Sequence, residues 1–226
     1  CTQVICSDKT GTLTQNKMTV VKTAGDDTDL LARAMALCCD AQLDSSNQAV
    51  GEPTECALVN FAYKEGMDKN QMQKASPRIG EAPFDSMRKM MSTVHKTENG
   101  AIIQYTKGAP DEVLKCCTKA WIGGKEVSMT DELKENILRE NKEMADQALR
   151  VLGAACRRWS EAPASYDAEF LEQDLCYIGL TGMIDPVRPE VVDAIEECRS
   201  AGIRPIMITG DHKDTAAAIA KELRII

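Results

Sequence analysis

The sequence predicts an α/β domain built on a parallel sheet and interrupted by a large inserted α+β domain with an antiparallel sheet. Near each end of the chain, a short apolar run leads into an acidic turn that contains a Thr-Gly pair. Between these runs, helical periods alternate with short strands. Ligands collect at the carboxyl ends of strands in open α/β sheets, so we expect both acidic turns to face one phosphate group.

The C-terminal unit shows the α/β pattern most clearly. Pro189 can open a helix, apolar residues then recur at helical spacing, and Gly202 stands where such a helix commonly stops. Residues 203–208, IRPIMI, are expected to form a buried strand, with Asp211 at its carboxyl end, and a second helix is expected from about Asp214. This strand, acidic turn and helix make one α/β unit.

The N-terminus repeats this order. Residues 2–7, TQVICS, are expected to form a second buried strand, and Asp8 stands at its carboxyl end.

The residues between these two α/β units follow a different pattern of helices and strands. Asn99-Gly100 is a strong hairpin signal, and Thr130 is a suitable N-cap for a helix whose first turn is acidic. The sequence predicts helices at 30–39, 53–65 and 131–148, and strands at 88–95, 101–106, 149–157 and 175–183.

Composition excludes several classes of protein. The 226 residues carry a formal net charge of -8, so no overall basic field is present to hold a nucleic acid. No apolar run approaches the roughly 18 residues of a membrane span. Among 10 cysteines, the adjacent pairs Cys38-Cys39 and Cys116-Cys117 suit neither a disulfide framework nor a zinc site, and we expect reduced, mostly buried cytosolic thiols. From Cys1 and Ile226 at its ends, we expect a fragment of a longer protein.

Residues 5–14, ICSDKTGTLT, contain the parts of a phosphoryl acceptor. The carboxylate of Asp8 can attack a phosphoryl group if cations offset the repulsion between the two anions. Lys9 supplies a cation, Gly11 allows unusual backbone geometry, and the hydroxyls of Thr10 and Thr12 stand beside amides that can cradle phosphate oxygens. Asp8 and the Thr10 backbone can share a Mg²⁺ ion, which prefers oxygen ligands. Composition alone fits an ordinary helix cap equally well.

The ordered string DKTGTLT, Asp8 to Thr14, resembles the phosphorylation motif of the P-type ATPases. KGAPD at 107–111, DPVRPE at 185–190 and MITGD at 207–211 resemble further motifs of this family, in the family's order. GEPTECAL at 51–58 and FDSMRKMMS at 84–92 are similar to the calcium-pump branch of type II. The resemblance therefore extends over almost the whole chain.

The resemblance implies a fold and an activity. The fold would be haloacid-dehalogenase-like (Rossmann-type), with residues 1–22 and 176–226 in the phosphorylation domain and residues 23–175 in the nucleotide-binding domain. The parent protein would be a membrane pump that couples ATP hydrolysis to cation transport, most closely calcium transport. This headpiece would lie on the cytoplasmic face, work with the pump's actuator domain and membrane helices, and have little catalytic activity alone.

Catalytic roles follow from the resemblance. Asp8 would become the aspartyl-phosphate, Thr10 would help to hold Mg²⁺ and the transferring group, and Lys9 would act electrostatically nearby. The turn Thr209, Gly210 and Asp211 would approach the γ-phosphate and its ion. Asp185 and Arg188 would support the hinge between the domains.

The resemblance also implies a set of ATP-binding residues. Phe84 would stack on adenine, and Glu55 would hydrogen-bond the base or orient its neighbours. Gly108 would let the ligand approach the backbone closely, and Arg150 would meet the phosphates. The same cleft would be lined by Lys89, Met91 and Lys107.

Structural interpretations of these residues stay open. Phe84 and Met91 are equally suited to a core, Lys89 and Arg150 to a solvated surface, and Glu55 to an electrostatic helix cap.

One departure from the family pattern concerns the segment after Phe84. Ser86 stands where the family often has Arg, so Arg88 is the candidate substitute.

Two other functions fit parts of the sequence. A soluble haloacid-dehalogenase-like phosphatase would want a second Asp two residues after the nucleophile, where this chain has Thr10. A nucleotide-binding module without catalysis of its own is the other alternative.

Overall fold

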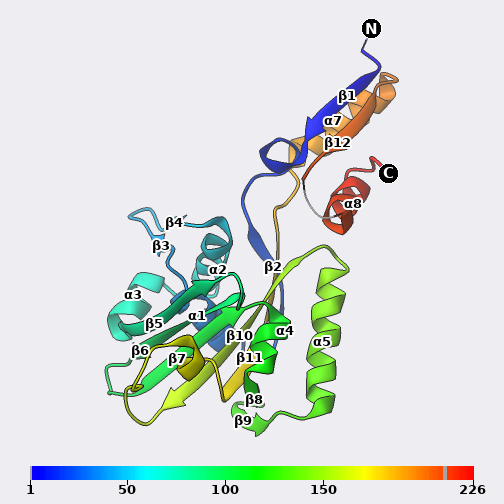
Figure 1. Cartoon of the computed structure of the whole chain (residues 1–226). Helices are drawn as coiled ribbons and strands as arrows, with labels where there is room; N and C mark the ends of the chain where they lie inside the picture. The colour runs from blue at the N-terminus through cyan, green and yellow to red at the C-terminus, as the bar shows by residue number, and fades with distance from the viewer. Residues whose placement is uncertain (1, 211–212) are drawn as a thin grey trace.

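The computed structural model describes residues 2–210 and 213–226, which form a small lobe and a large lobe (Figure 1). The small lobe holds β1 (Val4–Asp8), β12 (Arg204–Ile208), α7 (Pro189–Ser200) and α8 (Lys213–Glu222). β1 and β12 run parallel, with Val4 opposite Arg204 and Asp8 opposite Ile208. The predicted parallel sheet is confirmed for these two strands.

The expectation that both of these strands are buried is wrong. Val4 and Ile5 of β1 and Ile208 of β12 are exposed. In the described residues this sheet has two strands, so neither strand is covered by a further neighbour. The core of the small lobe lies to the side of the sheet, where Leu13 and Val187 pack against α8.

The large lobe is built on one eight-stranded sheet. Its strand order is β5-β6-β7-β10-β11-β8-β9. β8 pairs with residues 175–177 of β11, and β2 pairs with residues 180–184 of the same strand. Every pair is antiparallel except β11 with β8. The strands are β2 (Thr19–Ala24), β5 (Arg78–Asp85), β6 (Met90–Lys96), β7 (Ile102–Gly108), β8 (Cys117–Ile122), β9 (Lys125–Ser128), β10 (Arg150–Trp159) and β11 (Leu175–Ile184). The predicted hairpin is confirmed: β6 and β7 pair antiparallel, and Gly100 has φ 84° in the turn between them.

Helices cover both faces of this sheet, so alternate residues of each central strand meet different helices (Figure 1). In β11, Ile178 faces α1 and α2, whereas its neighbour Tyr177 faces α4 and α5. The helices are α1 (Thr28–Leu37), α2 (Pro53–Lys64), α3 (Lys69–Ala75), α4 (Pro110–Lys115), α5 (Asp131–Ala145) and α6 (Ala168–Leu171). A short separate hairpin joins β3 (Gln42–Leu43) and β4 (Ala49–Val50).

The predicted helices are confirmed with small shifts at their ends. The Thr130 hydroxyl accepts a hydrogen bond from the Leu133 amide at 3.2 Å, which caps α5 as predicted. This helix ends at Ala145 rather than 148, because Ala148 adopts a left-handed conformation with φ 58°.

The large sheet extends beyond the predicted limits of the inserted domain. β2 begins at Thr19 and β11 ends at Ile184, whereas the sequence places the domain at residues 23–175. These two strands carry the chain between the lobes (Figure 1).

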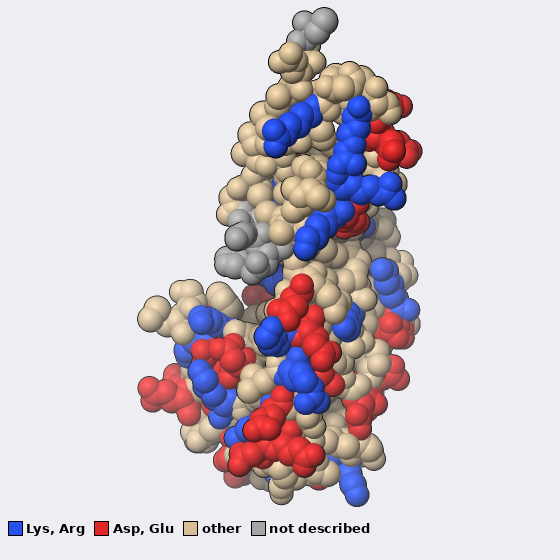
Figure 2. Space-filling model, turned by 90° about the vertical axis from the view of Figure 1, so that its right-hand side faces the viewer, with Lys and Arg blue, Asp and Glu red and all other residues tan. Residues whose placement is uncertain are grey.

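Acidic and basic side chains intermingle over the large lobe on the face drawn in Figure 2. This distribution agrees with the absence of an overall basic field from the composition. In the part of the chain that the structure describes, no helix combines the length and apolar character that a membrane crossing requires.

Candidate functional site

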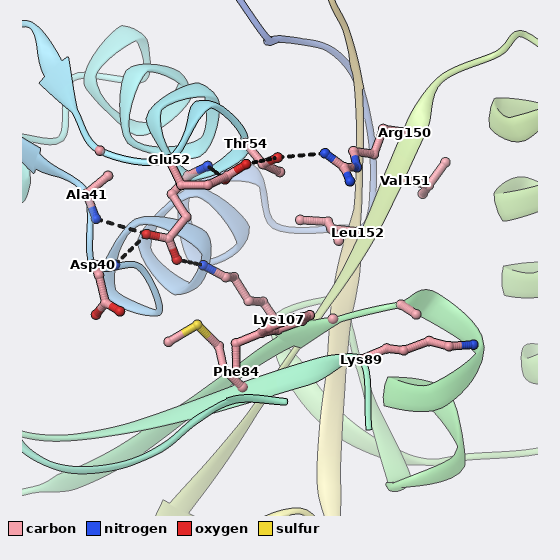
Figure 3. A pocket seen from close by; sticks show the side chains of 15 residues that line it. Asp40, Ala41, Glu52, Thr54, Phe84, Lys89, Lys107, Arg150, Val151 and Leu152 are labelled. Atoms are coloured by element: carbon pink, nitrogen blue, oxygen red, sulfur yellow. Dashed lines mark hydrogen bonds and ion pairs between the residues drawn. The ribbon is translucent and has the colours of Figure 1, made fainter. Parts of the chain in front are cut away.

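A pocket of about 750 Å³ opens in the large lobe between α2, the β5–β6 turn and the ends of β7 and β10 (Figure 3). Seven of the residues predicted for the nucleotide line it: Glu55, Phe84, Lys89, Met91, Lys107, Gly108 and Arg150. These residues come from segments up to 95 positions apart, and the fold brings them together.

A largely buried ion pair lies on one wall of this pocket. The Lys107 ammonium donates a hydrogen bond to the Glu55 carboxylate at 2.5 Å, and the side chains are only 8% and 15% exposed. The other carboxylate oxygen of Glu55 accepts from the amides of Asp40 at 2.7 Å and Ala41 at 2.9 Å (Figure 3). Glu55 is therefore fixed by three donors. It also lies in the first turn of α2, as the electrostatic interpretation requires, while the Glu52 side chain caps the helix by accepting from the Glu55 amide.

The surroundings of this pair favour the ionised form of both side chains, Lys107 and Glu55. Burial opposes the charge on Lys107, but Cys39, Cys38 and Glu55 outweigh it, so the pKa of the ammonium is raised. Burial likewise opposes the charge on Glu55, yet Lys107 and the two amides hold the pKa of the carboxyl below its ordinary value. Desolvation raises the pKa of the Cys39 thiol to about 12, so this thiol stays neutral beside Lys107 at 3.0 Å.

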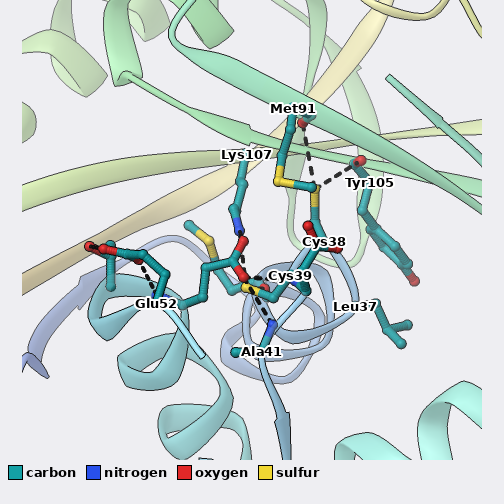
Figure 4. Close-up of polar contacts among 12 residues, drawn as sticks. Leu37, Cys38, Cys39, Ala41, Glu52, Met91, Tyr105 and Lys107 are labelled. Carbon is teal, nitrogen blue, oxygen red and sulfur yellow. Dashed lines mark hydrogen bonds and ion pairs between the residues drawn. The ribbon is translucent and has the colours of Figure 1, made fainter. Parts of the chain in front are cut away.

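The turn that presents these amides is tied to the sheet and to α3. The Cys38 thiol contacts the carbonyl oxygens of Met91 at 3.5 Å and Tyr105 at 3.4 Å (Figure 4). Lys69 is fully buried, and its ammonium donates to the carbonyls of Cys39 at 2.7 Å and of Ala41.

Arg78 adds a second cation to this turn. Its guanidinium donates to the carbonyl of Cys39 at 2.7 Å and to the carboxylate of Asp40 at 2.8 Å. The sequence analysis missed both Lys69 and Arg78, because nothing local distinguishes them from solvated cations. Both act through the turn rather than on the pocket itself.

Arg150 stands at the mouth of the pocket. Its guanidinium donates to the Thr54 hydroxyl at 2.9 Å, and that hydroxyl donates to the Glu52 carboxylate at 3.0 Å. Arg150 is exposed, and a guanidinium carries five N–H donors, so most of them are available to an anion. Position and donor supply therefore suit phosphate binding.

The two apolar residues of the pocket differ in exposure. Phe84 is 63% exposed, so the interpretation of this ring as core is wrong. Met91 is 2% exposed and packs in the core while it lines the pocket floor, so both of its interpretations apply.

Lys89 lines the pocket without pointing at the ion pair. Its side chain extends toward α4, away from Lys107, and its ammonium lies 4.0 Å from the Glu112 carboxylate (Figure 3). Arg88 does not line this pocket, since its guanidinium pairs with Glu172 and donates to the carbonyl of Pro83. The structure therefore does not support Arg88 as a substitute for the missing family Arg.

The structure gives a steric reason for glycine at position 108 that the sequence did not indicate. A Cβ atom at this position would lie 2.4 Å from Cβ of Met90 and 2.5 Å from the carbonyl oxygen of Lys89. The glycine is thus required by the close approach of β6, whatever room it leaves for a ligand.

The Asp8 loop lies in the other lobe. Asp8 ends β1 and is exposed, and the chain then turns over Lys9–Leu13, where Gly11 has φ 77° and the Thr14 amide donates to the Lys9 carbonyl at 3.0 Å. Thr10 is exposed, whereas Lys9 is buried at 7% exposure.

The DPVRPE segment holds this loop in place from 168 or more residues away. The Asp185 carboxylate accepts from the Thr14 hydroxyl at 2.6 Å and from the Lys17 amide at 3.0 Å. Arg188 donates to the carbonyl oxygens of Thr14 and Gly11, both at 3.0 Å. These contacts join the loop to the segment that leads from the large sheet into α7.

The second acidic turn follows β12. Thr209 and Gly210 come directly after Ile208, the strand partner of Asp8, whereas Asp211 lies outside the described residues. No group of three or more His, Cys, Asp or Glu side chains suited to a metal ion occurs within residues 2–210 and 213–226. Asp8, Lys9, Thr10, Thr209 and Gly210 are not among the lining residues of the pocket, so the fold keeps the predicted acceptor and the predicted binding site in separate lobes.

Comparison with known proteins decides the family. The sequence model for the P-type ATPase cytoplasmic domain N matches residues 27–190. The chain belongs to the P-type ATPase family. It is 48% identical to calcium-transporting ATPase 1 of Bacillus cereus over 98% of its length and 44% identical to calcium-transporting ATPase 1 of Lactococcus lactis over 100%. It is also 35% identical, over its whole length, to the human sodium/potassium-transporting ATPase subunit alpha-4.

This P-type ATPase chain spans 26% to 27% of the length of these curated relatives. The matched residues 27–190 include all seven predicted residues of the pocket, and Asp8 lies before them.

Proposed function

We propose that this chain is the ATP-binding and phosphorylation headpiece of an ATP-driven cation pump. The observation that carries the proposal is the pocket in which the Glu55–Lys107 pair, Phe84 and Arg150 converge, in a chain that also presents the exposed Asp8 carboxylate. Calcium is the proposed cation, because relatives named calcium-transporting ATPases are 37% to 48% identical, above the 35% of a sodium/potassium-transporting one.

In this proposal the large lobe holds ATP. The exposed Phe84 ring stacks on adenine, since a solvated aromatic face at a pocket rim is available for a base. Lys107 and Arg150 supply positive charge along the cavity, and Glu55 keeps the Lys107 ammonium in position. Lys89 and Met91 complete the walls.

The small lobe supplies the acceptor. An Asp8 carboxylate oxygen attacks the γ-phosphorus, the bond to the bridging oxygen of ADP breaks, and an aspartyl-phosphate remains on the chain. Asp8 and Thr10, whose oxygen atoms are exposed at the end of β1, would hold Mg²⁺, and Thr209, Gly210 and Asp211 would face the same phosphate. Bound Mg²⁺ would neutralise charge on the phosphate.

The domain organisation is part of the proposal. A haloacid-dehalogenase-like phosphorylation domain would contain residues 1–22 and 176–226, and residues 23–175 would form the nucleotide-binding domain, with the shared strands β2 and β11 as the connection. Phosphoryl transfer requires the two lobes to approach each other, because each lobe holds one reactant. The remaining domains of the pump and the membrane would be the partners of this cytoplasmic headpiece.

The test uses the full-length pump in membranes and ATP labelled at the γ-phosphate. We expect Asp8→Asn to remove the acid-stable phosphoprotein completely, because an amide is not a nucleophile for phosphorus, while ATP binding persists. The matched control is Asp29→Asn, since Asp29 is an exposed carboxylate in the first turn of α1. Label retained by Asp8→Asn at the level of the control would refute Asp8 as the acceptor, and binding without label in every form would leave only a nucleotide-binding module.

A further inference from the structure

Two cysteines stand directly opposite each other in the centre of the large sheet. Cys156 of β10 is the register partner of Cys176 of β11 in an antiparallel pair. Such partners share one face of a sheet, and their Cα atoms lie about 4.5 to 5.5 Å apart, within the range of roughly 4.4 to 6.8 Å that a disulfide spans. Both thiols are free, and the Cys176 thiol lies 3.9 Å from the carbonyl oxygen of Tyr177.

This arrangement is unusual among the cysteines that the structure describes. Cys38 precedes Cys39 and Cys116 precedes Cys117, so those pairs are neighbours in sequence, and in the described strands no other cysteine has a cysteine as its register partner. The geometry needed for a bridge is therefore built by the fold at one place.

The two thiols line a cavity of about 350 Å³ that is separate from the nucleotide pocket. Cys156 and Cys176 are buried, at 5% and 2% exposed, but both line this cavity, and its rim includes the exposed side chains of Lys119, Arg158 and Asp174. Cys156 lies six residues after Arg150 along β10, about 20 Å away at the rise of an extended strand.

The charges around the cavity distinguish the two sulfur atoms. The neighbouring Cys156 thiol lowers the pKa of the Cys176 thiol, with Lys119 and Arg158 acting in the same direction against burial and Glu126. The neighbouring Cys176 thiol and burial raise the pKa of Cys156.

The acidic side chains that line this cavity, Glu126 and Asp174, are paired with basic ones. Glu126 pairs with Lys119 at 2.8 Å and with Arg158 at 3.8 Å, and Asp174 pairs with Arg157 at 4.0 Å. Thiolate character therefore favours Cys176 over Cys156.

We propose that Cys156 and Cys176 form an oxidisable dithiol, a modification site that takes hydrogen peroxide as its oxidant and becomes a cross-strand disulfide. The Cys176 thiolate attacks one peroxide oxygen, the O–O bond breaks, and after proton uptake Cys176 is a sulfenic acid and one water has formed. The Cys156 sulfur then attacks the Cys176 sulfur, the S–O bond breaks, the S–S bond forms, and a second water leaves with the Cys156 proton. Two thiols and one peroxide give one disulfide and two waters.

The bridge would fasten β10 to β11 without moving them, because the strands are already paired at this register. It closes the loop that contains α6, so it raises the melting temperature. The nucleotide pocket lies at the other end of β10 and keeps its affinity.

The experiment treats the folded chain with hydrogen peroxide, blocks the remaining thiols, and maps peptides by mass spectrometry without reduction. We expect one linked species that joins the Cys156 and Cys176 peptides with loss of two hydrogen atoms, reverts with reduced glutathione, and melts at a higher temperature. Cys6 is the internal reference, since it is an exposed thiol. Unlinked Cys156 and Cys176 peptides at a peroxide dose that oxidises Cys6 would overturn the proposal.

Single variants assign the order of the steps. Cys156→Ser is expected to leave a sulfenic acid on Cys176 that a dimedone probe traps, whereas Cys176→Ser is expected to give no dimedone adduct on Cys156. A dimedone adduct on Cys156 in the second variant would overturn the assignment of Cys176 as the attacking thiol. The peptide map of the unsubstituted chain tests the bridge even if either variant fails to fold.

Discussion

The pocket of the large lobe and the Asp8 loop of the small lobe are built in opposite ways. In the pocket, a cation and an anion are largely buried against each other, and backbone amides fix the anion. In the loop, the carboxylate itself is exposed, and the fixed groups are those behind it, Thr14, Asp185 and Arg188.

This difference separates two tasks. A preorganised pocket keeps a ligand in one orientation at little cost in ordering, which suits the binding of a nucleotide. An exposed carboxylate on a rigid turn can receive a group that another lobe delivers. Substitutions in the first region should therefore change stability and ATP affinity together, whereas substitutions behind Asp8 should change the small lobe alone.

The largest expected effect is the loss of one member of the ion pair. Lys107→Met leaves the largely buried Glu55 carboxylate without its cation, so we expect the free energy of unfolding in urea to fall by about 3 to 5 kcal/mol. The double variant Glu55→Gln with Lys107→Met should recover part of that loss.

Lys115→Met is the matched control for this experiment, because the exposed Lys115 pairs with Glu112 on the surface. A change within about 0.5 kcal/mol is expected there. Equal losses for Lys107→Met and Lys115→Met would show that the pocket pair is no more than a surface contact.

The next effect is a pH dependence that belongs to the large lobe. His95 is buried, one ring nitrogen lies 3.0 Å from the Ser76 carbonyl oxygen, and desolvation lowers the pKa of the imidazole to about 4 from 6.5. Between these values the unfolded chain binds a proton that the folded chain does not, so stability is complete above pH 6.5 and is lost as the pH falls toward 4. We expect a loss of about 3 kcal/mol over that range.

Chemical denaturation at several pH values measures this loss. His95→Gln keeps hydrogen-bonding groups but does not titrate, so its stability should vary less between pH 6.5 and 4. The same slope in both proteins would assign the pH dependence to other groups.

A smaller effect, confined to the small lobe, is expected behind Asp8. Thr14→Val removes the hydroxyl that donates to the Asp185 carboxylate at 2.6 Å, and a hydrogen bond to a charged group contributes about 1.5 to 3 kcal/mol. Hydrogen exchange should accelerate at the amides of β1 and β12 and stay unchanged in β7 and β10. Thr12→Val, at an exposed position of the same turn, is the control. Faster exchange throughout the large sheet would contradict the separation of the two regions.

The sequence predicts the elements of this fold well because each one has a local cause. Helical periodicity, the Thr130 cap and the Asn99-Gly100 turn act within a few residues, and the structure places helices and a hairpin there. The burial of β1 was predicted wrongly because it depends on which strands and helices lie beside it, not on its own apolar residues.

The site divides in the same way. Motif residues such as Glu55 and Phe84 can be found in the sequence, and the structure places them in one pocket. The buried Lys69 behind the Cys39 carbonyl cannot be found, because its partners lie 28 and 30 residues away. The steric requirement for Gly108 likewise arises from the neighbouring strand β6.

The central claim is that the large-lobe pocket holds ATP, and calorimetric titration of this chain with ATP tests it most directly. We expect micromolar to millimolar affinity, weakened about tenfold or more by Phe84→Ala, because the 63% exposed ring is free to stack on a base. Lys107→Ala should also weaken binding, whereas Met87→Ala, at an 87% exposed position of the same turn that does not line the pocket, should not. Unchanged affinity in both Phe84→Ala and Lys107→Ala would contradict the claim.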